Sequence, residues 1–276
     1  MVTDLEGIAE YFPRRVSGAS RPTDPAAPLA TPEVSAAETR IEDPQAETPQ
    51  TETSPVGPVD ALPRAPISSS QDPEDARSLQ TSLGSEAQRS FVARAQVLGA
   101  NAWRAVELGS GLGDVAIGMV RALPGLHLIA VEVSATMLAL ARRKQGVMHT
   151  NVAFVGFVGG DAVATGLPGQ SCDLVLAYGL VHRLEAPLAL FVEVARLARD
   201  DAAIYICDLR RPETPEALGR AAADQDEEWS ERQRRQLQAA LRVDEVRALC
   251  VAAALTTVEV RACGEHHWEA VRARRR

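Results

Sequence analysis

From residue 104 onward, short apolar runs alternate with longer stretches of helical apolar spacing, and this alternation limits the possible folds more than any other feature. The apolar runs predict strands at residues 104–108, 126–131, 152–155, 173–177 and 203–207. Helices are expected between them at residues 114–123, 135–144 and 187–199, with Ser134 as the N-cap of the second. Alternating strands and helices predict an α/β fold with a doubly wound, mainly parallel sheet.

Further elements flank this alternation. The apolar residues Leu79, Leu83, Phe91, Val92, Ala95 and Leu98 predict one or two amphipathic helices before the first strand. After the fifth strand, a polar helical stretch is expected at 215–241 and a helix at 243–254, followed by strands at 257–261 and 267–271.

The first part of the chain differs in composition. Residues 1–90 contain 12 of the 17 prolines, and 15 acidic against 7 basic side chains. Such a segment cannot bury enough apolar surface to offset its ordering entropy, so residues 1–75 are expected to be largely disordered and residues 76–276 to form the folded domain. Residues 5–12 have helical apolar spacing, which fits a short docking element or a frayed terminus equally well.

The charge distribution counts against nucleic acid as the main partner. The whole chain has 37 acidic and 29 basic side chains, so residues 91–276 hold 22 of each and lack the basic field that nucleic acids demand. The basic run at residues 272–276 is interpreted as a solubilising tail. With no signal peptide and no apolar span, we expect a cytoplasmic protein without a membrane partner.

No metal site is predicted. The four cysteines are scattered, without a pair at metal-ligand spacing. His266 and His267 are neighbours on a predicted strand, where they would point to opposite faces and could not share one ion.

A glycine-rich turn joins the first strand to the next helix, with the pattern Glu107-x-Gly109-x-Gly111-x-Gly113. Glycines let the backbone turn sharply and let a ligand approach main-chain amides. The overlapping pattern Gly111-x-Gly113-x-x-Ala116 also fits a dinucleotide site, so the glycines alone do not separate dinucleotides from S-adenosylmethionine.

Two acidic residues bear on this choice. Glu107, two residues before the first glycine, would repel a pyrophosphate but would stabilise the ammonium and sulfonium of S-adenosylmethionine. Glu132 follows the second strand, 21 residues after Gly111, and can accept hydrogen bonds from both ribose hydroxyls of either cofactor. Glu107 therefore favours S-adenosylmethionine, and the two residues together indicate a nucleoside site.

Four segments, in order and spacing, resemble the cofactor motifs of class I S-adenosylmethionine-dependent methyltransferases of bacterial type. They are residues 106–113, 131–138, 160–162 and 172–176, the last followed by Leu180-Val181-His182. The similarity covers roughly residues 85–271. It implies a Rossmann-like seven-stranded sheet whose last hairpin is antiparallel.

The resemblance also implies roles for individual residues. Glu107, Gly109, Ser110 and Gly111 would border the methionine part of the cofactor, Ala177 would lie at the end of the fourth strand, and Glu132 would bind the ribose. Val133 and Met137 would flank the adenine, Asp161 would accept from its amino group, and Ala162 would offer its backbone amide. Met137 is equally typical of a helix core position, and Asp161 of a turn.

The sequence departs from the family at two places. Residues 199–202 replace the Pro-Gly-Gly that commonly precedes the fifth strand, which changes a turn remote from the cofactor. Residues 156–160 are more apolar than is usual before the acidic motif that ends at Asp161.

The acceptor side of the site is expected where the fourth and fifth strands end. His182 is the first candidate for a general base and Tyr178 the second, although a buried structural histidine fits the sequence equally well. Asp208 and Arg210 are expected near the acceptor, and Arg210 and Arg211 could instead pair with the acidic residues 224–228. The fourth strand lacks the Asn/Asp-Pro-Pro-aromatic motif of enzymes that methylate base amines.

Three hypotheses remain from the sequence. The first is a methyltransferase that acts on a small molecule rather than on a nucleic acid. The second is an NAD(P)-binding oxidoreductase or sensor, and the third is a non-catalytic cofactor-binding protein whose acidic N-terminal segment binds partners. The sequence gives no oligomeric state.

Overall fold

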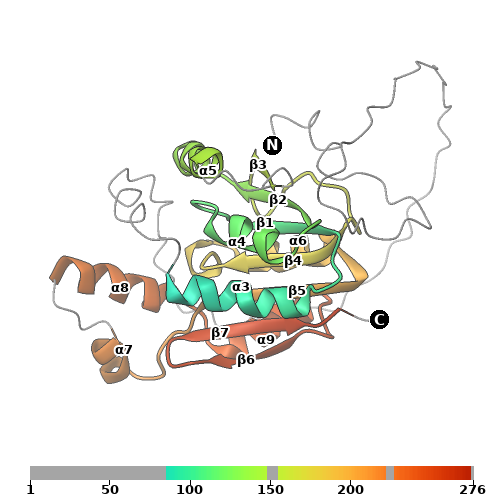
Figure 1. Cartoon of the computed structure of the whole chain (residues 1–276). Helices are drawn as coiled ribbons and strands as arrows, with labels where there is room; N and C mark the ends of the chain where they lie inside the picture. Colours follow the sequence, from blue (N-terminus) through green and yellow to red (C-terminus); the bar gives the residue numbers. More distant parts are fainter. Residues whose placement is uncertain (1–84, 148–154, 222–226, 275–276) are drawn as a thin grey trace, which may run out of the picture. The chain divides into compact units, whose positions relative to one another are not determined.

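The computed structural model describes residues 85–147, 155–221 and 227–274. These residues form a seven-stranded sheet in the order β3-β2-β1-β4-β5-β7-β6. The strands are β1 (Arg104–Leu108), β2 (His127–Glu132), β3 (Val155–Gly159), β4 (Cys172–Tyr178), β5 (Ala198–Leu209), β6 (Glu259–Cys263) and β7 (His267–Arg272). Strands β1 to β5 pair in parallel with one another, and β7 is antiparallel to both β5 and β6. The predicted fold class is confirmed (Figure 1).

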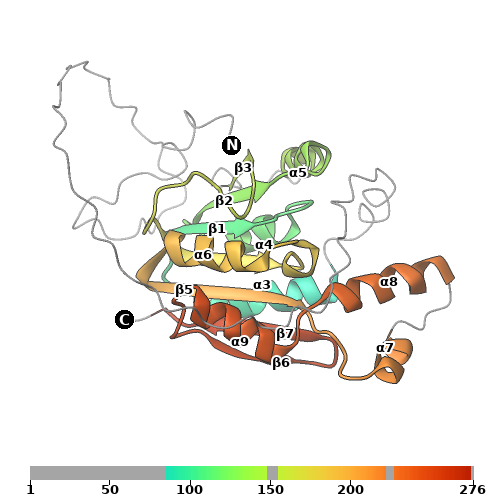
Figure 2. The same ribbon diagram turned by 180° about the vertical axis from the view of Figure 1, so that it is seen from behind.

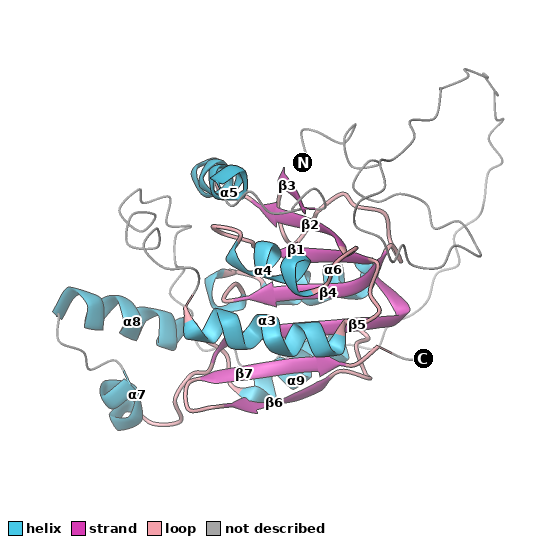
Figure 3. Ribbon diagram, viewed as in Figure 1, coloured by secondary structure: helices cyan, strands magenta, loops and turns pink. Residues whose placement is uncertain are grey.

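Helices cover both faces of the sheet. One face carries α3 (Glu86–Leu98), α4 (Asp114–Ala122) and α5 (Ala135–Val147), and Figure 2 shows α6 (Pro187–Leu197) and α9 (Val243–Ala252) on the other. Between β5 and α9 lie α7 (Pro215–Ala221) and α8 (Glu227–Ala239), and a short 3-10 helix, η2 (Val181–Arg183), follows β4. Figure 3 distinguishes these helices from the strands and loops. No helix within the described ranges has both the length and the apolar character needed to cross a membrane.

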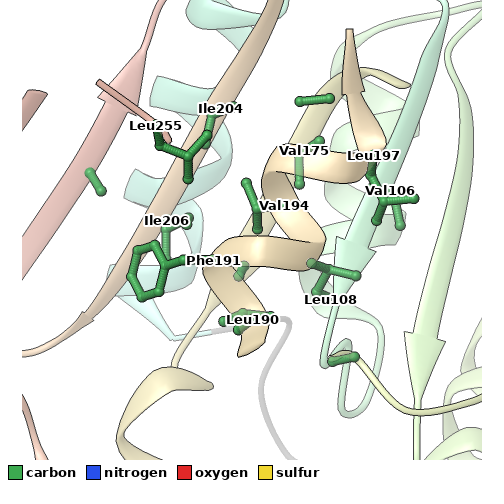
Figure 4. Close-up of a cluster of buried hydrophobic side chains, with 14 of the residues drawn as sticks. Val106, Leu108, Val175, Leu190, Phe191, Val194, Leu197, Ile204, Ile206 and Leu255 are labelled. Carbon is green, nitrogen blue, oxygen red and sulfur yellow. The ribbon is translucent and has the colours of Figure 1, made fainter. Parts of the chain in front are cut away.

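The apolar core has two layers because the parallel strands are buried on both faces, and alternate residues of each strand point to opposite sides. The layer under α6 and α9 is drawn in Figure 4, where Phe191 and Val194 of α6 face Ile204 and Ile206 of β5. The layer under α3 and α4 contains Phe91, stacked on Tyr205 with ring centroids 4.3 Å apart.

The third strand continues beyond its predicted end at residue 155. The expected strand at 152–155 overlaps β3 only at Val155, because β3 continues through residues 156–159, and residues 148–154 lie outside the described part. Four of the five β3 residues are buried. Residues 156–159 are therefore apolar because they form a buried strand, and they are not part of a loop before Asp161.

The expected turn at 199–202 was also wrong. Helix α6 ends at Leu197, and Ala198 already pairs with Cys172 as the first residue of β5, with a register shift before the regular pairing of Leu174 with Ala203. Arg199 and Asp201 form an ion pair at 3.5 Å at this end of the strand. Charged side chains at an exposed strand end obscured the strand pattern in the sequence.

Other boundaries agree within a few residues, with two exceptions. The helical stretch predicted at 215–241 is divided into α7 and α8. The leading helix is described only from Glu86, so Leu79 and Leu83 lie outside the described residues, as do the predicted disordered segment and residues 5–12.

Candidate active site

The strand order reverses between β1 and β4, since β2 and β3 lie on one side of β1 and β4 and β5 on the other. In open α/β sheets, ligands bind outside the carboxyl ends of the strands at such a switch point. The glycine turn follows β1 at this end, and η2 with His182 follows β4.

The three glycines of the turn all have positive φ, at 72° for Gly109, 52° for Gly111 and 75° for Gly113. A Cβ on Gly109 would lie 2.7 Å from Leu180 Cδ1, and one on Gly113 would lie 2.5 Å from Phe157 Cζ. A Cβ on Gly111 would meet no atom within 4 Å. Two glycines are therefore required by packing, whereas Gly111 borders open space that a ligand can enter.

Glu132 connects the ends of three strands. Its Oε2 accepts a hydrogen bond from Gly111 N at 2.8 Å, its Oε1 accepts one from Ser134 N at 2.8 Å, and its carbonyl accepts one from Gly160 N at 3.1 Å. The structure thus brings together the glycine turn, the acidic residue after β2 and the segment after β3, as the sequence predicted.

Residues near Glu132 show how an adenine could be held. Val133 is 69% exposed although it is apolar, and Met137 is half-buried on the first turn of α5, where its amide donates to the Ser134 Oγ at 3.3 Å. Asp161 is exposed, and its Oδ1 accepts from Val163 N at 3.0 Å. Asp161 is therefore a turn residue, with one carboxylate oxygen still free to accept from a ligand, and Ala162 beside it is buried.

Glu107 is a buried carboxylate, and the residue is only 2% exposed. Within the described residues, its Oε2 has no hydrogen-bond partner. Burial raises the pKa of the Glu107 carboxyl well above its usual range, the charges of Asp114 and Glu132 raise it further, and a hydrogen bond from the Ala116 backbone opposes them. The neighbouring Ser110 Oγ is also buried without a partner. A cationic ligand group would stabilise the ionised form of Glu107.

His182 and Asp208 form a buried pair, with side chains 5% and 1% exposed. His182 Nδ1 lies 2.6 Å from Asp208 Oδ1, and His182 Nε2 has no hydrogen-bond partner in the part of the chain that the structure describes. Asp208 Oδ2 accepts from Val181 N at 2.5 Å. Sequence reasoning placed both residues in the acceptor region but did not pair them. The sequence did contain one signal for this pairing, because the two residues lie at the ends of successive predicted strands.

Tyr178, the second candidate base, points toward α3, whereas Ala177 beside it belongs to the core layer on the opposite face. The ring of Tyr178 packs edge-on against Phe91, with centroids 5.1 Å apart. Burial raises the pKa of the Tyr178 hydroxyl, with smaller contributions from Cys207 and Asp208 that outweigh a hydrogen bond with Ser85. A phenol of raised pKa stays protonated near neutrality, so Tyr178 is the weaker candidate.

The arginines after β5 have separate partners. Arg210 Nη2 donates to the Glu265 carbonyl at 2.7 Å, and its side chain is half-buried. Arg211 forms an ion pair with Glu245. The alternative partners at 224–226 lie outside the described residues, as do the side chains of 227 and 228.

Asp173 lies at the opposite end of the sheet, so it takes no part in this site. Its Oδ2 accepts from Trp103 N at 3.0 Å and Arg104 N at 3.1 Å, and Arg199 and Arg274 lie within 3.6 Å and 3.5 Å of its Oδ1. Arg274 therefore attaches the end of the domain to Asp173. The prediction that residues 272–276 form a solubilising tail was wrong for Arg274.

The described residues contain no group of three or more His, Cys, Asp or Glu side chains that could hold a metal ion. His267 begins β7, and burial lowers its pKa. His266 is also half-buried, and its Nε2 lies 3.9 Å from Glu265 Oε2.

Comparisons with known proteins identify this architecture. Residues 106–206 match a family model described as a methyltransferase domain. The plantazolicin methyltransferase BamL, solved with a triazolic desmethylPZN analog and S-adenosylhomocysteine, has a TM-score of 0.54 at 18% identity, covering 68% of this chain and 69% of that chain. No curated protein matches the sequence significantly.

Two further structures share the fold. A methyltransferase from Aquifex aeolicus has a TM-score of 0.52 at 16% identity, covering 72% of this chain and 97% of that chain. Phosphoethanolamine N-methyltransferase 2 of Haemonchus contortus has a TM-score of 0.51 at 17% identity, covering 62% of this chain but only 38% of that chain. Residues 106–206 therefore resemble a methyltransferase domain, and the described sheet and helices share the fold of these solved methyltransferases.

Proposed function

We propose that this protein transfers a methyl group from S-adenosylmethionine to a small-molecule acceptor. The observation that carries the proposal is Glu107, a buried carboxylate with an unpartnered oxygen beside the glycine turn. A pyrophosphate near this carboxylate would be repelled, whereas the α-ammonium and sulfonium of S-adenosylmethionine would be stabilised. This charge preference separates the proposal from a dinucleotide-binding oxidoreductase.

The sheet supports the same choice. Dinucleotide-binding sheets commonly have the strand order 3-2-1-4-5-6, all parallel. In this chain, the antiparallel strand β7 lies between β5 and β6. This topology does not favour the NAD(P)-dependent alternative.

The residues around the turn fit the cofactor in a definite arrangement. Glu107, Gly109, Ser110 and Gly111 would hold the methionine part, and Glu132, already within hydrogen-bond reach of Gly111 N, would accept from the ribose hydroxyls. Val133 and Met137 would flank the adenine, with Asp161 and Ala162 at its polar edge and Ala177 at the end of β4. The cofactor supplies a methyl group already activated on a sulfonium.

The acceptor would lie toward β4 and β5, near His182, Asp208 and Arg210. The protein's main contribution is to align the acceptor atom with the methyl carbon and the sulfur, because orientation supplies much of the rate enhancement of such a displacement. His182 is the proposed base. A small acceptor agrees with the balanced charge of residues 91–276, which offers no field for a nucleic acid.

Calorimetric titration with S-adenosylmethionine, S-adenosylhomocysteine and NADPH tests the proposal. We expect micromolar binding of both adenosyl compounds, no heat from NADPH, and loss of binding in Glu132→Ala. Binding of NADPH alone would contradict the proposal. Tight binding of the adenosyl compounds without turnover on any acceptor would instead favour a non-catalytic binding protein, in which the N-terminal segment could bind partners.

A further inference from the structure

The carboxylate of Asp208 is held rigidly by three donors. Its Oδ2 accepts from Val181 N at 2.5 Å, and its Oδ1 accepts from Leu209 N at 2.6 Å and faces His182 Nδ1 at 2.6 Å. Since an ionised carboxylate only accepts hydrogen bonds, the hydrogen in the contact with His182 must be on Nδ1. The Nε2 atom of a neutral His182 then carries a lone pair.

That lone pair has no partner in the described structure, although Nε2 is buried. Leaving a buried polar atom unsatisfied costs about 1–3 kcal/mol, so a structural histidine would be expected to use both nitrogens. Leu180, two residues before His182, packs against Gly109 of the glycine turn. The segment that carries His182 therefore packs against the glycine turn through Leu180, and Nε2 of His182 keeps a lone pair without a partner among the described residues.

The surroundings of the pair suit a base. Among the described residues, three titratable groups besides His182 lie within electrostatic reach of Asp208, namely Tyr178, Cys207 and His267. Burial raises the pKa of Tyr178 and Cys207 and lowers that of His267, so it favours the uncharged form of each. Helix α8 packs against η2 and helps to shield the pair. When His182 takes up a proton, the buried charge of Asp208 compensates for it.

We propose that His182 and Asp208 act as a base that removes the proton of an acceptor hydroxyl, so that this chain is an O-methyltransferase for a phenol or enol. This inference rests on the proposed function. The acceptor oxygen forms its bond to the methyl carbon as the carbon–sulfur bond of the donor breaks. The bonding pair stays on sulfur, and the hydroxyl proton moves to His182 Nε2 and later to water.

The choice of acceptor atom follows from where a base is needed. An aromatic hydroxyl ionises near pH 10, so at pH 7 almost none is present as the nucleophilic anion. A thiol with a pKa of about 8.5 is partly ionised without help, and an aromatic amine is neutral at pH 7 and attacks through its own lone pair. Among acceptors of these three kinds, a dedicated histidine–carboxylate pair therefore gives a hydroxyl the largest benefit.

The protonation state of His182 can be tested without any acceptor. In the full-length protein with ¹⁵N-labelled histidine and bound S-adenosylhomocysteine, NMR should show a neutral His182 with its proton on Nδ1 at pH 7–8. In Asp208→Asn, which removes the charged acceptor, the preference for that tautomer should weaken. A proton on Nε2, or a permanently charged ring, would overturn the inference.

Transfer is tested with three coumarins that differ only in the acceptor atom: 4-methylumbelliferone, 7-amino-4-methylcoumarin and 7-mercapto-4-methylcoumarin. With ¹³C-methyl S-adenosylmethionine, we expect the methyl group on oxygen. A methyl group on nitrogen or sulfur would overturn this inference but leave the proposed function intact. If none of the three coumarins is methylated, the NMR measurement of the His182 tautomer alone decides whether the inference stands.

Variants separate a role in proton transfer from a role in folding. His182→Gln should lower kcat about 10²–10⁴-fold, the usual contribution of a positioned base, and Asp208→Asn should lower it by less and alter its pH profile. Both should bind S-adenosylhomocysteine within about threefold of the wild type. His127→Gln, at the amino end of β2, is the matched control and should retain activity. Equal activity of His182→Gln and the wild type would contradict the inference.

Discussion

Two residues at and after the end of β1 have properties that do not stabilise the fold but suit the binding of a ligand. Glu107 is buried with an oxygen that has no partner among the described residues, and Gly111 has a left-handed backbone conformation next to open space. Neither feature stabilises the ligand-free protein. Residues that break local rules in this way are commonly found at functional sites.

Replacing Glu107 with Gln should change how stability depends on pH. A carboxyl whose pKa is raised by folding contributes stability that is present below about pH 4, its unfolded pKa, and is lost as pH rises through the folded value. Without ligand, Glu107→Gln should therefore be increasingly more stable than the wild type as pH rises from 5 to 8. Thermal unfolding measures this, with Glu259→Gln, at an exposed position on β6, as control. A difference that is constant with pH would contradict the prediction.

The glycines of the turn provide a matched pair of substitutions. Gly111→Ala should cost only about 1–2 kcal/mol of unfolding free energy through its left-handed φ, but it should strongly weaken S-adenosylhomocysteine binding. Gly113→Ala should cost about 1–3 kcal/mol more, because its Cβ would collide with Phe157. Urea denaturation and calorimetry measure the two effects. Equal loss of stability in both variants would contradict this interpretation.

At the scale of elements, α3 and the β6–β7 hairpin stabilise each other across the sheet. Glu269 of β7 is 2% exposed and faces Arg94 of α3 at 2.9 Å and Arg261 of β6 at 2.5 Å. Tyr205 of β5 donates to Glu269 at 3.2 Å and stacks on Phe91 of α3. This helix before β1 is therefore an integral part of the domain.

Truncating Phe91 tests that conclusion. Phe91→Ala should lower the unfolding free energy by about 3–5 kcal/mol, because a fully buried ring is replaced by a cavity against Tyr205. Val97→Ala on the same helix should change it by less than about 0.5 kcal/mol, since Val97 is 77% exposed. Urea denaturation compares the two, and a small effect of Phe91→Ala would show that α3 is not needed for the fold.

At the scale of the whole molecule, the two ends of the parallel strands have different tasks. The residues that we propose to bind ligands gather at the carboxyl ends of β1, β2, β4 and β5. At the opposite end, buried Asp173 connects the strands to Arg199 and to Arg274 near the C-terminus, whose side chain is 17% exposed. The chain thus closes its fold on the side away from the site.

Shortening the chain at its C-terminus should lower the free energy of unfolding if Arg274 stabilises the fold. Removing residues 274–276 should lower the unfolding free energy by about 1–3 kcal/mol, since the buried Asp173 loses one of its two cationic partners. Removing residues 275 and 276 alone should have little effect. Chemical denaturation distinguishes the two forms. Equal stability would assign Arg274 to the solubilising tail after all.

The sequence alone determined the sheet class, most of its elements and the grouping of the glycine turn with Glu132. These follow from the period of apolar residues and from short-range spacing, both of which are properties of local sequence. The same local reasoning ended β3 too early and placed a turn where β5 begins, because a buried glycine-containing strand and a charged strand end do not show the usual patterns.

Only the tertiary structure decided which distant residues meet. His182 and Asp208 are 26 residues apart, and Asp173 and Arg274 are separated by most of the domain. Their contacts depend on which strands become neighbours and on the register between them, and the sequence pattern does not state either. The depth at which Glu107 is buried was likewise fixed by packing on both faces of the sheet, because burial depends on every element that covers a strand.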